Sequence, residues 1–417
     1  MSSTATGSLP FVADPTEASG AGGARAASVG IAGAGQLARM ACEAASSLGL
    51  RTVVLAAHPD DAATEVASEV LVGLPTVEKD LRLLADRSDV VTFDHEHVDL
   101  SLLELLAGEG VAVRPDAGTL ALAVDKSLMR SRLHNAGVPV PAHADLGRPG
   151  ATGGVEDVVA AVEEFADNHG WPLVLKAVRG GYDGKGVWPV GDRAEAESVC
   201  RQAGEAGVEL LVEERVAIDT ELAVLVARRP GGQIVSWDPV ETVQEGGICR
   251  EVLVPGALGG ELAAQAGTLA RRVAEITGST GVLAVELFWA GGRLMVNEVA
   301  ARPHNSGHWT IEGSTTSQFE NHLRAVLDLP LGRTERAAPH VASVNVLGGA
   351  DGRDPAQLLA AALSEEGAHV HLYGKAARPG RKLGHVTVLG TDATETRNRA
   401  WRAARALGTP TAPGGDR

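Results

Sequence analysis

One stretch constrains this chain more than any other: a single lysine interrupts an apolar run, and a glycine-rich loop follows. The run from Leu173 to Val178 has the character of a buried β-strand, and Lys176 is its only charged residue. A lysine in such a strand needs an anion close by. The loop that follows, RGGYDGKG, contains four glycines within seven residues.

A loop of this composition suits phosphate binding. Glycines reach backbone angles closed to other residues and can direct N–H groups at phosphate oxygens, while Arg179 and Lys185 add positive charge. The stretch therefore predicts a site for a nucleotide polyphosphate. The alternative is a solvated β-hairpin whose lysine extends to water.

Length and charge set outer limits. A chain of 417 residues is too long for one ordinary core, so we expect two or three domains. The 53 acidic and 37 basic residues give a net charge of -16, which argues against a general nucleic-acid or anionic-membrane surface. The three cysteines lie far apart and predict neither a disulfide framework nor a zinc site, which fits a reducing cytoplasm.

The ends of the chain carry little pattern. No apolar run reaches membrane-spanning length, and residues 1–25 lack the basic start and apolar core of a signal peptide. We expect residues 1–25 to be a disordered tail, and likewise TPTAPGGDR at the other end.

The first organised unit has a βαβ pattern. A strand enters a glycine turn at SVGIAGAG, a helix follows at QLARMACEAASSLG, and RTVVLAA reads as a second parallel strand. Gly33, Gly35 and Ala38 satisfy the loose dinucleotide fingerprint, with Asp60 and Asp61 where a ribose-binding acid would lie. A nicotinamide dehydrogenase is therefore one alternative.

Acidic residues follow two later strand patterns. DVVTFDHEHV places Asp94 and Glu96 at a strand end, where doubly wound sheets bind ligands, although such acids also serve as helix caps. ELLVEERV ends in Glu213 and Glu214, which could bind the adenosine end of a nucleotide or simply face solvent. Between these strands, DKSLMRSRLHNAG predicts a helix that begins near Lys126 and precedes a domain hinge.

Two apolar strands flank Gly291 and Gly292, a pattern typical of a β-hairpin. A two-residue loop would pair Glu286 with Asn297, and a loop one residue longer would pair it with Glu298. Facing carboxylates in apolar strands repel unless one is protonated or a cation lies between them. We therefore expect magnesium here, because it favours one or two carboxylates plus phosphate oxygens. The alternative is a structural pair bridged to arginines.

Two further segments are rich in polar or basic residues. ARPHNSGHWT crowds arginine, histidine, asparagine and serine into a short turn, which suits an anionic substrate. After a strand at HVASVNVLG, the segment HVHLYGKAARPGRKLGHVTVLG resembles a hairpin with a basic cluster suited to phosphate. The alternative is an edge strand that uses cations to resist aggregation.

Four motifs in order resemble one family. They are GxGQLxRM, VLKAxRGGYDGKG, VNEVAxRPHNSGHWT and YGKxxRPGRKxGH. Across residues 28–395 the chain resembles the N5-carboxyaminoimidazole ribonucleotide synthetases of purine biosynthesis, in the ATP-grasp superfamily. The resemblance implies an α/β and α+β fold, with a Rossmann-like pre-ATP-grasp domain at 26–123 and an ATP-grasp domain at 124–335 that includes a lid at about 140–215. A small β-rich domain at 336–400 and a tail at 401–417 would follow.

The resemblance implies a carboxylation. ATP would phosphorylate bicarbonate to carboxyphosphate, whose carboxyl group, as CO2, would pass to the exocyclic amine of 5-aminoimidazole ribonucleotide. It implies ATP with Mg2+, or Mn2+, as cofactors, small-molecule partners only, and a homodimer in the cytoplasm.

The resemblance also assigns site residues. For ATP they are Lys126, Lys176, Gly181, Tyr182, Asp183, Gly184, Lys185, Gly186, Glu213, Glu214, Val216, Glu221, Asn297 and Glu298. For the ribonucleotide and bicarbonate they are Gly35, Gln36, Leu37, Asp94, Glu96, Tyr182, Asn305, Ser306, His308, Lys375, Arg381 and Lys382. The metal ligands would be Glu286 and Glu298, and the catalytic residues Asp183, Lys375, Arg302 and His308.

The chain shows four departures from the family pattern, two of which, Asp94 and His97, lie in one strand end. A Glu-x-Glu-Asn strand end is Asp94, His95, Glu96 and His97 here, Val187 replaces a glutamine, and an arginine and a lysine are exchanged as Lys126 and Arg130. None of these removes a predicted metal ligand, so we expect an active enzyme. The alternatives are an ATP-grasp carboxylase or ligase with another amine acceptor, and a non-catalytic nucleotide-binding regulator.

Overall fold

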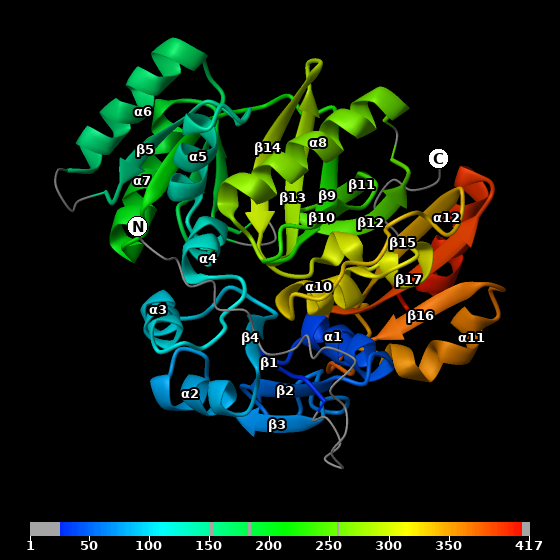
Figure 1. The fold of residues 1–417 in the computed structure, drawn as a ribbon. Coiled ribbons are helices and arrows are strands. Elements are labelled where there is room, and N and C mark those ends of the chain that lie inside the picture. The colour runs from blue at the N-terminus through cyan, green and yellow to red at the C-terminus, as the bar shows by residue number, and fades with distance from the viewer. Residues whose placement is uncertain (1–25, 150–153, 182–184, 257, 411–417) are drawn as a thin grey trace.

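The computed structural model describes residues 26–149, 154–181, 185–256 and 258–410. Three sheets organise these residues: a parallel sheet at the N-terminus, a small sheet in a separate lobe, and a large sheet that runs through the body of the molecule (Figure 1). The tail expected at residues 1–25 lies outside the described part of the chain.

The N-terminal segment forms the predicted parallel sheet. Its strands are β1 (Ser28–Ala32), β2 (Arg51–Ala56), β3 (Glu69–Val72) and β4 (Val90–Phe93), in the order β3–β2–β1–β4. The helices α1 (Gln36–Ser47), α2 (Glu78–Asp86) and α3 (Leu100–Gly108) cover it, with α1 in one apolar cluster and α2 and α3 in another. Because β1 and β4 are parallel neighbours, the glycine turn after β1 and Asp94 after β4 lie at the same edge.

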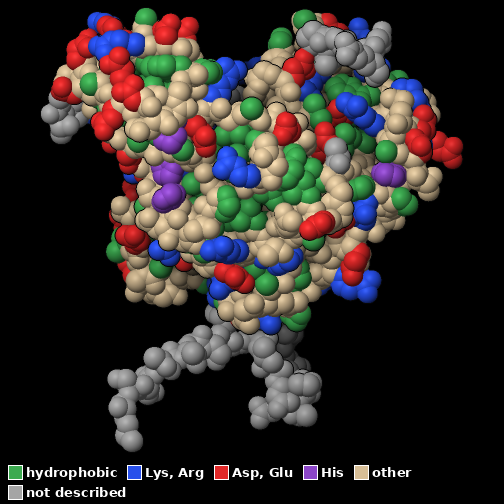
Figure 2. Space-filling model, turned by 90° about the horizontal axis from the view of Figure 1, so that it is seen from above, with side chains coloured by type: hydrophobic (Ala, Val, Ile, Leu, Met, Phe, Trp, Pro, Cys, Tyr) green, Lys and Arg blue, Asp and Glu red, His purple; other side chains and the backbone are tan. Residues whose placement is uncertain are grey.

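Two helices lead from this sheet into the small lobe. They are α4 (Ala117–Val124) and α5 (Lys126–Asn135). The lobe has the antiparallel strand order β5–β8–β6–β7. Its elements are β5 (His143–Gly147), α6 (Val155–His169), β6 (Leu173–Ala177), β7 (Val187–Val190), α7 (Arg193–Ala206) and β8 (Leu210–Glu214). Seen from above, acidic side chains lie over the surface together with Lys and Arg side chains (Figure 2).

The large sheet joins the central and C-terminal parts of the chain. Its order is β14–β13–β9–β11–β12–β15–β17–β16, with β10 paired to β9. The strands are β9 (Thr220–Arg228), β10 (Ile234–Ser236), β11 (Val240–Glu245), β12 (Ile248–Val254), β13 (Gly281–Ala290), β14 (Arg293–Ala300), β15 (His340–Leu347), β16 (Ala368–Leu372) and β17 (Lys382–Gly390). The predicted C-terminal domain is thus hydrogen-bonded to the central sheet through β12 and β15.

Helices cover the large sheet and connect it to the N-terminal sheet. They are α8 (Gly260–Thr277), α9 (Thr310–Gly313), α10 (Gln318–Val326), α11 (Leu359–Leu363) and α12 (Ala393–Ala406), with 3-10 turns at Asn305–Gly307 and Pro355–Leu358. In Figure 1, α10 lies between the large sheet and α1. His322 on α10 contacts Thr92 of β4 at 2.8 Å, and Arg114 donates to the carbonyl of Val326 at 2.7 Å. These buried bonds fix the two sheets relative to each other.

The expected tail from residue 401 is wrong for residues 401–410. Helix α12 continues to Ala406, with Ala403 and Ala404 in the C-terminal apolar cluster. Thr409 is buried and its hydroxyl accepts from the backbone N–H of Leu347. The alanine-rich end of this helix packs on β15 and β17 because small side chains let it approach the sheet closely.

Candidate active site

The hairpin of β13 and β14 brings two carboxylates face to face. Its loop has two residues, since Ala290 pairs with Arg293, and both loop glycines have positive φ. Glu286 nevertheless faces Glu298, because a β-bulge shifts the register between Glu286 and Leu287. The structure thus combines the two-residue loop of the first predicted register with the Glu286–Glu298 pairing of the second.

These carboxylates have unequal surroundings. Burial, together with the charges of Glu298 and Glu221, raises the pKa of Glu286 to about 7. His304 Nε2 lies 3.5 Å from Glu286 but brings little charge, because burial lowers the pKa of this imidazole to about 3. Glu298 instead has an ammonium partner, Lys126 Nζ, at 3.0 Å.

Among the described residues, no arginine forms an ion pair with either carboxylate, and Arg302 donates from Nε to Glu96 at 2.8 Å instead. The alternative of an arginine-bridged pair is therefore wrong. The predicted catalytic residue Arg302 and the predicted substrate residue Glu96 are brought together by this bond between the N-terminal and central parts of the chain.

The donor set fits a magnesium ion that arrives with phosphate. Within the described ranges, no three or more His, Cys, Asp or Glu side chains cluster to hold a metal on their own. Glu286 and Glu298, with the neutral oxygen of Asn297 at the bulge, supply the one or two carboxylates that Mg2+ favours when phosphates and water complete its shell. A metal held by protein alone does not fit this set.

The lysine of the apolar strand is buried and paired. Lys176 lies on β6, and its Nζ is 2.6 Å from Glu213 Oε2, while Arg130 Nε lies 2.6 Å from Glu213 Oε1. Lys176 Nζ also donates to Asn297 Oδ1 at 3.4 Å. The solvated-hairpin alternative for Lys176 and the solvent-facing alternative for Glu213 are therefore wrong.

The charges of this cluster are tightly matched. Burial acts to raise the pKa of Glu213, but Arg130 and Lys176 outweigh it and lower that pKa to about 2. Burial lowers the pKa of Lys176, and Glu213 opposes the shift. A nucleotide that contacted the Glu213 carboxylate directly would have to replace one of these cations.

The glycine loop closes against the end of β6. Gly186 has a φ of +72°, and its carbonyl accepts from Ala177 N at 2.8 Å. A Cβ on Gly181 would lie 2.8 Å from the carbonyl oxygen of Lys185, so the close approach of the two loop limbs requires glycine there. The predicted residues Tyr182, Asp183 and Gly184 lie outside the described part of the chain.

The remaining predicted nucleotide residues lie near the end of β8 and the start of β9. Glu214 Oε1 accepts from Ala142 N at 2.9 Å, and Val216 is half-buried in the connection that follows. Burial raises the pKa of Glu221 on β9. Glu221 is close enough to Glu286 to act on its pKa, which places it beside the carboxylate pair.

The turn after β1 meets Asp94 after β4. Gly35 N donates to Asp94 Oδ2 at 2.5 Å, and a Cβ on Gly33 would lie 1.8 Å from Asp94 Oδ1. The helix-cap alternative for Asp94 and Glu96 is wrong: among the described residues, Asp94 accepts only from the N–H of Gly35, which precedes the first turn of α1, and Asp99 caps the following helix α3. Burial raises the pKa of Asp94, and its Oδ1 is buried without a hydrogen bond.

The C-terminal hairpin reaches this same turn. Lys375 Nζ donates to Gln36 Oε1 and lies 5.8 Å from the ring centre of Tyr373. The basic residues from Lys375 to Lys382 occupy the connection between β16 and β17 and the first position of β17. Since β17 lies between β15 and β16, and the outer strand β16 contains no Lys or Arg, the edge-protection alternative is wrong.

His308 lies inside the protein. Its ring stacks on His385 with centroids 4.6 Å apart, and its Nε2 contacts Asn305 Oδ1 at 3.1 Å. Burial lowers the pKa of His308 far below its usual range. In this position the neutral ring orients Asn305. Ser306, also predicted, contacts His304 Nδ1 through its hydroxyl at 2.9 Å.

Sequence reasoning missed several supporting residues. The sequence drew attention to Arg130 only through its exchange with Lys126. Its spacing from the apolar Met129 and Leu133 places it on the buried face of α5, and this spacing could have identified it as a buried arginine. Gln318 holds His304 by two hydrogen bonds, at 2.8 and 2.7 Å. Glu312 contacts His371 at 2.6 Å beside the histidine stack, and no local pattern indicated that pair.

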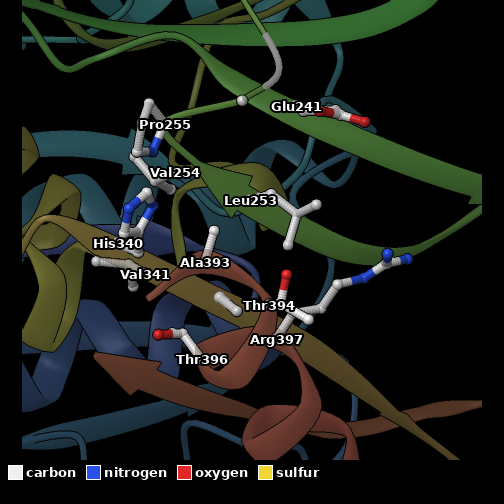
Figure 3. Close-up of a pocket in the computed structure, with 12 residues that line it drawn as sticks. Glu241, Leu253, Val254, Pro255, His340, Val341, Ala393, Thr394, Thr396 and Arg397 are labelled. Atoms are coloured by element: carbon white, nitrogen blue, oxygen red, sulfur yellow. The ribbon is translucent and has the colours of Figure 1, made fainter. Parts of the chain in front are cut away.

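A separate cavity of about 330 Å³ lies between β12, β15 and the start of α12 (Figure 3). Leu253, Val254 and Pro255 face His340 and Arg397 across it. None of the residues predicted for nucleotide, metal or ribonucleotide lines it. Across the described ranges, the helices are too short or too polar to cross a membrane.

The small lobe and the large sheet, which carries the Glu286–Glu298 pair on its β13–β14 hairpin, are the arrangement of an ATP-grasp protein. Residues 133–319 match the ATP-grasp domain, and residues 26–124 match the ribonucleotide synthetase preATP-grasp domain. Residues 342–399 match the phosphoribosylaminoimidazole carboxylase C-terminal domain. The predicted fold class is confirmed.

Whole-chain comparisons identify the family. An N5-carboxyaminoimidazole ribonucleotide synthase of Mycobacterium tuberculosis is 47% identical over 91% of this chain and 87% of its own length. The Thermus thermophilus synthetase structure has a TM-score of 0.81 at 36% identity, covering 92% of this chain and 99% of that one. An Aspergillus clavatus synthase, solved with ADP and 5-aminoimidazole ribonucleotide, has a TM-score of 0.82 at 32% identity, with coverage of 92% and 99%. The chain belongs to the N5-carboxyaminoimidazole ribonucleotide synthase family.

Proposed function

We propose that this chain carboxylates 5-aminoimidazole ribonucleotide with ATP and bicarbonate, giving N5-carboxyaminoimidazole ribonucleotide, ADP and phosphate. The observation that carries the proposal is that all three parts of the chain contribute polar residues to one region. Lys126 pairs with Glu298, Arg302 pairs with Glu96 and acts on the pKa of both Glu286 and Asp94, and Lys375, which is bonded to Gln36, also acts on the pKa of Asp94. A reaction that joins a phosphorylated carboxyl group to an amine needs such continuity between two binding regions.

ATP and the ribonucleotide phosphate would bind at opposite ends of this region. At the nucleotide end, bicarbonate oxygen attacks the γ-phosphorus and ADP leaves, and the lysines there offset charge on the transferred group. The resulting carboxyphosphate releases phosphate and CO2, and the exocyclic amine forms the new C–N bond and loses one proton. At the other end Lys375, Arg381 and Lys382 hold the ribonucleotide phosphate.

A divalent cation belongs to this proposal. Glu286, Glu298 and Asn297 would hold Mg2+, which supplies electrostatic stabilisation of the transferred phosphoryl group. Asn297 suits this role because it lies at the bulge beside Glu298, and its Oδ1, which accepts from Lys176 Nζ, faces the nucleotide end of the site. The cytoplasmic location and the homodimer stay predictions.

An ADP-release assay tests the proposal. Purified protein is given ATP alone, ATP with bicarbonate, and ATP with bicarbonate and 5-aminoimidazole ribonucleotide. We expect rapid ADP release only with all three, together with one N5-carboxylated product per ADP. Stimulation by another amine but not by this ribonucleotide would indicate a different ligase, and intact ATP binding without turnover would indicate a regulator.

A further inference from the structure

One lysine already occupies a carboxylate of the predicted metal site. Lys126 Nζ is 3.0 Å from Glu298 Oε1, and Glu298 faces Glu286 across the hairpin. The Lys126 side chain is 11% exposed, whereas that of Glu298 is 38% exposed. The ammonium group therefore covers one oxygen of a carboxylate that is otherwise open to a ligand.

The backbone of Lys126 is fixed, and its side chain is long. Lys126 is the first residue of α5, and its N–H donates to the carbonyl of Val178, at the end of β6, at 3.0 Å. The preceding Asp125 caps the helix and accepts from Arg179 at 2.9 and 2.7 Å. The four-carbon side chain thus starts beside the glycine loop and extends to Glu298, so one rotamer change can redirect its charge.

We propose that Lys126 is the resident counter-ion of Glu298, and that it exchanges this carboxylate for a nucleotide phosphate when a metal–nucleotide complex binds. The exchange couples the binding of the divalent cation to that of the nucleotide. This inference rests on the proposed nucleotide and metal site. An ammonium and a divalent cation repel strongly at one carboxylate, so metal without nucleotide must displace Lys126 into solvent, whereas phosphate gives the ammonium a new partner.

The neighbouring lysine cannot make this exchange. Lys176 is paired with Glu213, whose side chain is only 3% exposed and is also bound by Arg130. Removing Lys176 from that carboxylate would break a buried network. We therefore assign the coupling to Lys126 rather than to Lys176. Linked binding equilibria are reciprocal: if nucleotide strengthens metal binding by some factor, metal strengthens nucleotide binding by the same factor.

Mn2+ and ADP serve as probes. Mn2+ binding to nucleotide-free protein is followed by electron paramagnetic resonance of the free ion, and ADP affinity is measured in chelator and in saturating Mn2+. In Lys126→Met we expect Mn2+ alone to bind at least about fivefold tighter, and the Mn2+-dependent gain in ADP affinity to shrink by a similar factor. Lys126→Arg should behave as wild type, because it keeps the charge.

Arg132→Gln is the matched control, since it removes one positive charge from the exposed face of the same helix. The exchange is overturned if Lys126→Met leaves Mn2+ affinity unchanged while Glu298→Gln abolishes it, or if Arg132→Gln strengthens Mn2+ binding equally. If Glu298→Gln binds Mn2+ as wild type does, the metal-site assignment and the exchange fail together, whereas the carboxylation stands or falls with the ADP-release assay. Melting temperatures of all variants establish that each is folded.

Discussion

Two carboxylate clusters lie side by side in this site, and they are built in opposite ways. At Glu213, two cations, Arg130 and Lys176, surround one carboxylate, and all three side chains are at most 9% exposed. At the hairpin, Glu286 and Glu298 face each other, Lys126 pairs with Glu298, and both carboxylate side chains are about one third exposed. The pKa of Glu213 is lowered to about 2, whereas that of Glu286 is raised to about 7.

From this difference in charge balance, we interpret the Glu213 cluster as structural and the hairpin cluster as ligand-binding. A buried network with matched charges holds α5, β6 and β8 together, and removing one member leaves an uncompensated charge. A half-open cluster with too few cations is incomplete until a ligand supplies positive charge. Charge balance thus distinguishes a structural carboxylate from a ligand-binding one, although both lie among apolar strands.

The largest expected effect comes from the incomplete cluster. Glu298→Gln should lower turnover by about 10³-fold or more, because it removes a predicted metal ligand and the partner of Lys126. The melting temperature should change little. Steady-state ADP release across a Mg2+ titration measures the effect, and near-normal turnover with an unaltered Mg2+ dependence would show that the metal assignment is wrong.

The complete cluster should respond in stability. Arg130→Met leaves Glu213 with one buried partner fewer, and we expect a loss of about 3–5 kcal/mol in the free energy of unfolding. Lys126→Met, a lysine of the incomplete cluster, should cost under about 1 kcal/mol. Urea unfolding compares the two variants, and equal losses would remove the distinction between scaffold and site.

The connection between β16 and β17 extends the comparison, because residues 375–382 contain lysines and arginines but no Asp or Glu. If Arg381 and Lys382 hold the ribonucleotide phosphate as proposed, replacing both by Ala removes charge-assisted hydrogen bonds to it, each worth roughly 1.5–3 kcal/mol. The affinity for 5-aminoimidazole ribonucleotide should fall by about 10²-fold or more, while ATP affinity stays unchanged. Arg378→Ala, exposed in the same loop, is the control. Unchanged ribonucleotide affinity in calorimetric titrations would show that this hairpin holds no phosphate.

Local patterns predicted much of this site. The glycine pair at 291–292 predicted the hairpin, and the two possible loop lengths predicted that Glu286 would pair with Asn297 or with Glu298, of which the structure has Glu298. The bulge at Asn297 could not be predicted, because it depends on how β14 packs against the rest of the molecule: Val296 N donates to the carbonyl of Pro139. A contact over such sequence distance leaves no local signal.

Contacts between segments far apart in the sequence also explain why the histidine stack was not predicted. The stack of His308, His385 and His371 joins three segments, with centroid distances of 4.6 and 4.5 Å. Each histidine alone resembles a polar residue of a ligand site. Only the fold shows that the rings fill one another's surroundings, so that His308 positions Asn305.

The smallest effect tests the electrostatic side of the comparison directly. Glu286 has a pKa of about 7 in the folded protein against 4.5 as its ordinary value, so between these two pH values the folded state binds more protons than the unfolded state. Its contribution to stability is therefore fully present below pH 4.5 and is lost as the pH rises through 7. Glu213, with a pKa near 2, is ionised in the folded state throughout this range, and its contribution cancels between two variants that both contain it. In chelator, the difference in unfolding free energy between wild type and Glu286→Gln should fall between pH 5 and pH 8 by on the order of 1 kcal/mol, a value reduced for the partial exposure of Glu286. A difference that stays flat with pH would mean that Glu286 is already ionised without a metal, and that the hairpin draws its missing charge from a residue other than Lys126.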